Sequence, residues 1–224
     1  MSKIIALCSV PRVGWMDFMG QSIAAFANNS ITYRNLFGVF WAQSLSGGIK
    51  EALDAGHDYI ITCDYDSIFD TETVAQLVRL ADQNPHADAI CAMQMGRFSG
   101  LLVSTDSGTL TRKDLKEKPL VPIHTGHFGL TIFRASAFKD MIKPWFWSKP
   151  DNDGEWKRNG EGKQDEDIYF WKNFDASGKK LYLAPRLVIG HLELLIKYPD
   201  ENLEGIYVKT SDYYEKGVPA DVWK

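Results

Sequence analysis

Short apolar runs that alternate with helix-like segments constrain the fold of the first 95 residues most strongly. Residues 3–10, 58–63 and 87–93 are apolar runs of strand length, whereas 44–55 and 70–81 repeat apolar side chains at helical spacing. Asp70 stands where the N-cap of the second of these helices is expected. Strands that alternate with helices in this way build parallel sheets covered by helices. We therefore expect an α/β fold with a doubly wound, mostly parallel central sheet and helices on both faces.

Four further segments have less regular patterns. Residues 15–28 indicate a helix and residues 31–39 a strand. Residues 99–118 suggest a small antiparallel excursion around a turn at Thr105-Asp106-Ser107-Gly108. Residues 148–164 are polar, glycine-rich and without periodicity, which is typical of a lid or a disordered loop.

Composition excludes several classes of protein. A chain of 224 residues with 45% hydrophobic residues fits one soluble domain, and its net charge of −4 gives no basic footprint for non-specific nucleic-acid binding. No apolar run reaches the length of a transmembrane helix, so we expect no membrane anchor of that kind. Cys8, Cys63 and Cys91 lie in apolar runs, which predicts free core thiols and a reducing, cytoplasmic location.

Two aspartates stand directly after the apolar run 58–63. Asp64 and Asp66 are two residues apart, so on an extended strand their carboxylates project to the same side. Such a pair repels itself unless a hard cation such as Mg²⁺ or Mn²⁺ lies between the oxygens. In doubly wound sheets, ligands bind beyond the carboxyl ends of strands, where this pair stands. The pattern favours a divalent metal site, against the alternative of a simple turn capped by Asp66 or Ser67.

The chain resembles glycosyltransferases of the GT-A fold, especially family-2-like members of bacteria and phages. The resemblance covers about residues 3–195 and is carried by the segments 4–12, 48–66, 125–134 and 165–170, followed by 178–185 and Gly190-His191. It implies one GT-A-like domain with a nucleotide-sugar-binding half (1–95), an acceptor and catalytic half (96–195) and a C-terminal extension (196–224). One departure is Ala42-Gln43-Ser44-Leu45, where relatives often carry an Arg-Asn pair.

The resemblance implies a metal-dependent transfer of sugar from a UDP- or GDP-type nucleotide-sugar to an acceptor hydroxyl. Mn²⁺ or Mg²⁺ would be held by Asp64, Asp66 and His191, with Asp66 the preferred direct ligand and Asp64 alternatively on the ribose or a metal-bound water. Tyr65 lies within the same donor motif. The loop Pro11-Arg12 would contact the nucleotide. The alternative is a turn without a role in binding.

Three successive acids, Asp165, Glu166 and Asp167, open the segment 165–170 of the resemblance. In inverting relatives this region supplies the base, so the resemblance assigns Asp167 to remove the proton from the acceptor hydroxyl, with a pKa raised by its acidic neighbours. Glu166 is the alternative base, or a group that holds the acceptor. In retaining relatives the region binds donor or acceptor hydroxyls. The structural alternative is a helix start favoured by the helix dipole.

The acceptor site is predicted less sharply. Gly126 would permit close approach of a sugar, and His127 would contact the acceptor or a donor phosphate. Sugars stack on aromatic rings, so one or two of the tryptophans 145, 147, 156 and 171 would form an acceptor platform, with Trp147 our choice, although core packing is the default for tryptophan.

The identity of the acceptor stays open among a saccharide, a lipid-linked sugar, a protein and a hydroxymethylated base of phage DNA. DNA would need a basic cluster, for which the candidates are Lys113, Lys116, Lys118, Lys157, Arg158 and Lys163. Two other functions are alternatives to glycosyl transfer. A sugar-nucleotide nucleotidyltransferase is disfavoured because residues 10–14 lack a glycine-rich, basic phosphate loop. A nucleotide-sugar-binding module without catalysis is disfavoured by the acids and His191.

Overall fold

The computed structural model describes residues 2–10, 16–38, 40–96, 100–101, 103–105, 110–157 and 160–223. Its strands are β1 (Ile4–Val10), β2 (Thr32–Phe37), β3 (Tyr59–Asp64), β4 (Ser67–Ile68), β5 (Ala89–Met93), β6 (Val121–Ile123), β7 (Leu130–Arg134), β8 (Leu181–Val188), β9 (Gly190–His191), β10 (Leu195–Pro199) and β11 (Gly205–Lys209). Its α-helices are α1 (Met16–Asn28), α2 (Trp41–Asp54), α3 (Thr71–Gln83), α4 (Arg112–Glu117), α5 (Glu166–Ala176) and α6 (Thr210–Lys216).

A seven-stranded sheet organises the described part of the chain, in the order β2-β1-β3-β7-β5-β8-β6. β2, β1, β3, β5 and β8 run in one direction, whereas β7 is antiparallel to β3 and β5, and β6 is antiparallel to β8. The predicted mixed α/β architecture with a mostly parallel sheet is confirmed. Sequence patterns did not show that β7 enters the centre of the sheet in reverse, because that placement depends on partners far away in the chain.

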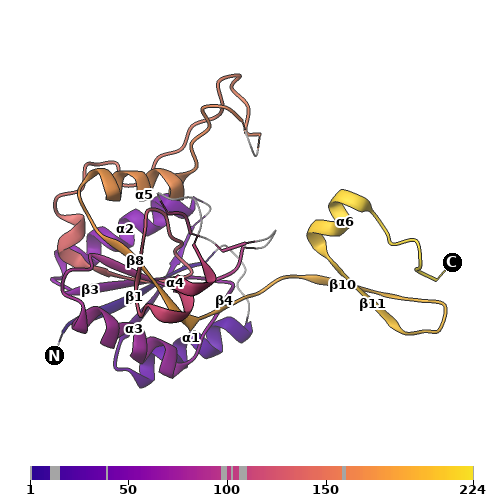
Figure 1. Cartoon of the computed structure of the whole chain (residues 1–224), viewed down its shortest axis with the longest axis horizontal. Helices are drawn as coiled ribbons and strands as arrows, with labels where there is room; N and C mark the ends of the chain where they lie inside the picture. Colours follow the sequence, from indigo (N-terminus) through magenta and orange to yellow (C-terminus); the bar gives the residue numbers. More distant parts are fainter. Residues whose placement is uncertain are drawn as a thin grey trace.

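Helices cover both faces of the sheet, as expected (Figure 1). Successive side chains of β1 alternate between the two faces, so Ile5 and Leu7 pack with α2 and α5, whereas Ala6 and Cys8 pack with α1 and α3. Asp70 caps α3 by accepting the Thr73 amide at 2.8 Å, which confirms the predicted N-cap.

An aromatic cluster fills the face beneath α5. The rings of Phe133 and Trp171 stack at a centroid distance of 5.7 Å, and Phe146 stacks on Phe170 at 4.8 Å. Trp145 and Trp171 are buried, so these two tryptophans belong to the core. The three cysteines are buried free thiols, which confirms the prediction made from their apolar surroundings.

The segment 99–118 differs from its expected antiparallel form. Among the described residues of this segment, antiparallel pairing consists of two isolated bridges, Met95 with Leu101 and Ser104 with Thr125. The predicted turn lies partly outside the described residues. The lysine-rich part forms α4 instead, because Thr111 accepts the Asp114 amide at 3.1 Å and caps a helix. The antiparallel strands of the sheet are β6 and β7.

The chain leaves the α/β body after β9 and forms an arm, residues 193–223, that projects from it (Figure 1). The arm consists of the β10–β11 hairpin, α6 and a C-terminal segment. Within the described residues, no helix combines the length and hydropathy needed to span a membrane.

Candidate functional site

Two adjoining cavities open at the carboxyl ends of β1 and β3, at the sheet edge where the sequence predicted a site. One measures about 780 Å³ and the other about 390 Å³. Both are lined by Trp41 and Asp64, so these two side chains stand where the cavities meet. The smaller cavity also contains Tyr65, Asp66 and His191, the residues expected from the sequence to bind the donor and its metal, and we call it the donor cavity on that expectation. The larger contains the start of α5, and we call it the acceptor cavity on the corresponding expectation.

Asp64 is held by a chain of hydrogen bonds across β1 and β3. Ser9 lies opposite Asp64 in the strand register, and its hydroxyl donates to Asp64 Oδ1 at 2.9 Å. The Trp41 indole N–H donates to the same hydroxyl at 3.1 Å. Burial raises the pKa of Asp64 to about 6; the Ser9 hydrogen bond acts against this shift, and the neighbouring charge of Asp66 adds to it.

Asp66 and His191 form a close pair at the rim of the donor cavity. The chain turns after β3, and β4 pairs with β9 so that Ser67 lies opposite His191. This register brings Asp66 Oδ2 to 3.2 Å from His191 Nε2. The other ring nitrogen, Nδ1, lies 3.0 Å from the Met95 carbonyl. A carbonyl only accepts, so Nδ1 carries the proton in that bond and Nε2 is the nitrogen that faces the carboxylate.

This pair could supply two ligands to a divalent cation. A histidine that binds a metal commonly donates its other ring N–H to a backbone carbonyl, which fixes the tautomer and the ring plane. The Asp66 and His191 side chains therefore suit the role of two metal ligands. The Asp64 carboxylate instead accepts the Ser9 hydroxyl. Among the residues that the structure describes, no group of three or more His, Cys, Asp or Glu side chains is arranged to hold a metal ion.

A buried glutamine fixes the strands that carry the pair. The Gln94 amide donates to Ser67 Oγ at 3.1 Å and to the Gly190 carbonyl at 3.2 Å, so it ties β4 to β9. The Leu192 amide adds a bond to the Asp66 carbonyl at 2.7 Å. Sequence reasoning missed Gln94, Ser9 and Trp41. The available signal was weak: Ser9 and Gln94 are polar residues at the ends of apolar runs.

Gly129 has no side chain, which leaves space for the hydrogen-bonded side chains of Gln94 and Ser67 beside it. We expect Gly129→Ala to disrupt these hydrogen bonds. A Cβ there would lie 2.8 Å from Ser67 Oγ and 2.9 Å from His127 Nδ1, and would also collide with the Gln94 side chain. Overpacking of this kind costs about 1–3 kcal/mol of unfolding free energy, measurable by urea denaturation. Gly47→Ala in α2 is the matched control, because a Cβ there meets nothing within 4 Å; equal stability of the two variants would contradict the assignment.

His127 is buried at the wall of the acceptor cavity, with both ring nitrogens engaged. Nδ1 accepts the Gly129 amide at 3.0 Å, and Nε2 lies 2.7 Å from the Ala92 carbonyl. Burial lowers the pKa of His127 to about 4, although the Ala92 bond acts against it. The ring is therefore neutral near pH 7 and holds the turn at 127–129. It offers no positive charge to a phosphate, and Gly126 beside it lines the cavity as expected.

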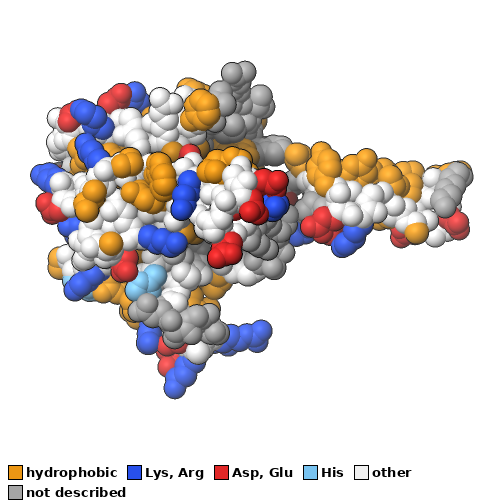
Figure 2. Space-filling view, turned by 90° about the horizontal axis from the view of Figure 1, so that it is seen from above, with side chains coloured by type: hydrophobic (Ala, Val, Ile, Leu, Met, Phe, Trp, Pro, Cys, Tyr) orange, Lys and Arg blue, Asp and Glu red, His pale blue; other side chains and the backbone are white. Residues whose placement is uncertain are grey.

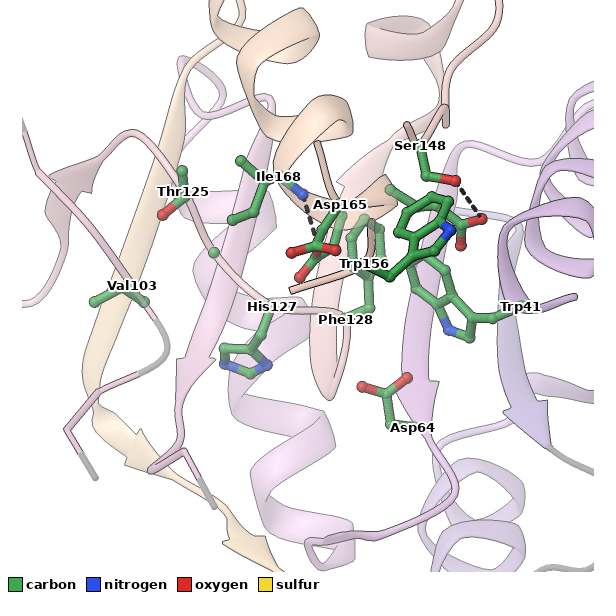
Figure 3. A pocket seen from close by; sticks show the side chains of 13 residues that line it. Trp41, Asp64, Val103, Thr125, His127, Phe128, Ser148, Trp156, Asp165 and Ile168 are labelled. Atoms are coloured by element: carbon green, nitrogen blue, oxygen red, sulfur yellow. Dashed lines mark hydrogen bonds between the residues drawn. The ribbon is translucent and has the colours of Figure 1, made fainter. Parts of the chain in front are cut away.

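The acids at the start of α5 project into the acceptor cavity from the side opposite Asp64 (Figure 3). None of the Asp165 oxygens caps the helix, so capping does not explain this residue. Asp165 pairs with Lys163 at 3.0 Å, and Glu166 Oε1 accepts the Ser148 hydroxyl at 3.4 Å. Asp167 Oδ1 accepts the Ile168 amide at 2.8 Å. Burial raises the pKa of Asp167; the Ile168 amide opposes the shift, and the charge of Asp165 adds to it.

The tryptophan that lines the acceptor cavity is Trp156, not our choice of Trp147. Trp156, which is 60% exposed, lines the acceptor cavity near Trp41 and Ser148 (Figure 3). Trp147 does not line that cavity and lies against Tyr169 at a ring distance of 5.7 Å. At the base of the segment that carries Trp156, Lys149 and Gln164 exchange backbone hydrogen bonds of 3.0 and 3.1 Å. Pro11 and Arg12 lie outside the described residues.

Comparison with known proteins supports the fold alone. No protein-family model and no curated protein matches the sequence. The structure is similar to the crystal structure of A197 from STIV, with a TM-score of 0.55 and 15% sequence identity, over 92% of this chain and 93% of that one. The likeness extends over nearly the whole of both chains, so the α/β arrangement occurs in a solved structure.

Proposed function

We propose that the protein is a metal-dependent glycosyltransferase that moves a sugar from a nucleotide-sugar to an acceptor hydroxyl. One observation carries the proposal: two cavities meet at Asp64 and Trp41, with the Asp66–His191 pair in one and the Asp167 carboxyl of raised pKa in the other. A group transfer needs two binding sites that share the reacting centre. A hydrolase or a simple binding module needs only one of them.

The donor would lie with its diphosphate against Asp66 and His191, which would hold Mn²⁺ or Mg²⁺. That cation, when bound, neutralises the charge that develops on the departing diphosphate. Asp64 would hold the ribose or a metal-bound water, fixed in place by Ser9 and Trp41. The apolar side chains of Val10 and Leu36 line the same cavity and provide room for the flat face of a base.

Asp167 would act as the base of an inverting transfer. The acceptor oxygen attacks the anomeric carbon, the bond from that carbon to the diphosphate oxygen breaks, and the hydroxyl proton passes to the Asp167 carboxylate. A raised pKa makes the carboxylate a stronger base than an ordinary aspartate. Glu166, which accepts the Ser148 hydroxyl, would bind an acceptor hydroxyl beside it.

The charge of the acceptor cavity favours an uncharged saccharide over DNA or a lipid diphosphate. Its lining includes four carboxyl groups, of Asp64, Asp165, Glu166 and Asp167, and no described Lys or Arg side chain. A phosphodiester would be repelled there. Of the basic residues considered for DNA, Lys163 pairs with Asp165, Lys157 with Glu155 and Lys118 with Asp114. Arg158 lies outside the described residues.

A donor screen tests the proposed reaction. The protein is incubated with individual UDP- and GDP-sugars and Mn²⁺ or Mg²⁺, without acceptor, and free sugar and nucleoside diphosphate are measured. We expect slow, metal-dependent hydrolysis of one donor class, with water in place of the acceptor. Release of nucleoside monophosphate or consumption of pyrophosphate would indicate nucleotidyl transfer. Thermal stabilisation by a donor without turnover would indicate a binding module, and no response to any donor would contradict the proposal.

Trp156→Ala is expected to weaken acceptor binding without affecting the donor. Loss of one stacked ring costs about 1 kcal/mol, so KM for a saccharide acceptor should rise roughly fivefold. Donor hydrolysis without acceptor should not change, because Trp156 does not line the donor cavity. Trp147→Ala is the control, since its ring lies outside both cavities. A larger effect of Trp147→Ala would favour Trp147 as the platform.

A further inference from the structure

The arm contains a two-stranded sheet, which is an incomplete structure by itself. β10 and β11 pair only with each other among the described strands, and the hydrogen bonds and ion pairs described for residues 193–223 join residues of the arm. An isolated hairpin is marginally stable in water and gains from additional strands. The arm also displays hydrophobic side chains along one side (Figure 2). Leu195, Tyr207 and Tyr214 of the arm are all more than half exposed.

The hydrogen-bond register identifies the groups that face outward from the hairpin. Thr210 donates to the Leu194 carbonyl at 3.2 Å, and Asp200 donates to the Glu204 carbonyl at 2.9 Å. Both pairs share the register of Leu195 with Lys209. Bonded and non-bonded pairs alternate in an antiparallel ladder, so the backbone groups of 206 and 208 point inward to β10. Those of Gly205, Tyr207 and Lys209 point away from β10, to the outer edge of β11.

The two edges of the hairpin differ in availability. The C-terminal segment lies along the end of β10, where Val222 bridges to Asp200 and the Trp223 amide donates to the Pro199 carbonyl at 2.9 Å. Pro199 also lacks an amide hydrogen. β11 is the opposite case: its sequence, Gly-Ile-Tyr-Val-Lys, contains no proline, and no described backbone bond uses its outward amides. An open edge of this kind is a template for another strand.

We propose that β11 pairs antiparallel with β11 of a second copy of this chain, about a two-fold axis at Tyr207, to form a four-stranded sheet. On that axis each Tyr207 amide meets the Tyr207 carbonyl of the other copy, and each Lys209 amide meets a Gly205 carbonyl. The outward backbone amides and carbonyls of β11 thus face matching groups of β11 in the second copy, as a two-fold interface requires. Lys209 is the N-cap residue of α6, so its carbonyl accepts the first hydrogen bond of that helix. The proposed pairing does not need this carbonyl.

Side-chain charge is compatible with the same arrangement. Opposite Lys209 stands Gly205 of the second copy, so the axis places no two like charges directly across from each other. The two Tyr207 rings would meet at the axis, and cross-strand aromatic pairs stabilise antiparallel sheets. The arm carries more acids than bases, which disfavours an anionic membrane as its partner.

Sedimentation equilibrium of the full chain tests the pairing through charge exchange. We expect a concentration-dependent dimer, because an interface made by one strand edge is small. Tyr207→Lys places two lysines face to face at the axis, and Tyr207→Glu places two glutamates there, so each variant alone should dimerise about tenfold more weakly. In a mixed dimer of the two variants, a lysine faces a glutamate at the axis. The mixture should therefore recover the dimer at low salt.

Two further measurements keep the test independent of misfolding. Tyr207→Pro removes an outward amide that β10 does not use, and should abolish the dimer while thermal unfolding of the body stays unchanged. A monomeric wild-type chain at every concentration would overturn the proposal. So would a dimer that survives Tyr207→Pro, or charge variants whose mixture dimerises no better than either alone. Because neither glycosyl transfer nor donor binding enters this assay, the two proposals fail separately.

Discussion

Asp167→Asn is expected to lower the rate of sugar transfer by about 10²–10⁴-fold, the usual contribution of a general base. Asparagine has nearly the same shape and accepts the Ile168 amide through its side-chain oxygen, but it cannot take a proton. Donor binding, measured by thermal shift with a nucleotide-sugar and Mn²⁺, should not change, because Asp167 does not line the donor cavity. Asp175→Asn on the exposed end of α5 is the control and should retain full activity.

The pH dependence gives the same prediction a second readout. Asp167 works as a base only when it is ionised, and its pKa in the folded protein is raised from 3.8 by burial. The transfer rate should therefore fall with decreasing pH at a higher pH than an ordinary aspartate would give. Asp165→Asn removes a charge that raises this pKa, so the acid limb should move to lower pH. An acid limb that does not respond to Asp165→Asn would assign the proton transfer to a different group, with Glu166 the first alternative.

Stability should change in the opposite direction to activity. A carboxyl with a raised folded pKa binds its proton more tightly in the folded state, so stability decreases as the pH rises from 3.8 through the folded pKa. Above that window the ionised, buried Asp167 costs stability. Asp167→Asn, which is always neutral, avoids this cost and should be about 1 kcal/mol more stable near pH 7, or roughly 2–4 °C in Tm. A destabilised variant would show that Asp167 serves the fold.

Local patterns predicted the elements that depend on nearby residues. The spacing of Val74, Leu77 and Ala81 and the Asp70 cap predicted α3, because a helix is determined by contacts three and four residues apart. Asp64 and Asp66 could be placed at a strand end because the apolar run that precedes them is also a local pattern. His191 required the resemblance to known glycosyltransferases, since no local pattern links it to Asp66.

The groups that sequence reasoning missed are those defined by register. Ser9 meets Asp64 only because β1 and β3 pair at that position, 55 residues apart in the chain. Gln94 acts on β4 and β9, whose own pairing joins residues 67 and 191. A one-residue slip would move each of these side chains to the other face. Trp41 was also missed, because an aromatic residue at the start of a helix usually packs in a core, and its indole N–H shows its role only beside Ser9.

Asp66→Asn is expected to abolish the metal-dependent part of donor binding. A nucleoside diphosphate with Mn²⁺ at about 100 times its Kd should stabilise the wild-type fold by about 2.7 kcal/mol, or roughly 5–10 °C in Tm. Removing one charged ligand from a two-residue metal site should lower metal affinity by at least 10–100-fold and eliminate most of that shift. Asparagine preserves the volume of the buried Asp66 side chain, so the fold should survive.

His191→Asn tests the second ligand separately. The asparagine amide can still donate to the Met95 carbonyl, as Nδ1 does, but nothing replaces Nε2 beside Asp66. We expect the loss of Mn²⁺-dependent stabilisation seen with Asp66→Asn, and no further loss when the two are combined, because both disable one site. Asp58→Asn, which stands before the amino end of β3, is the control. If both site variants keep the full Mn²⁺-dependent shift, the cation binds elsewhere and the proposed donor site is wrong. If the shift is lost while transfer persists, the metal serves binding and Asp167 alone carries the chemistry.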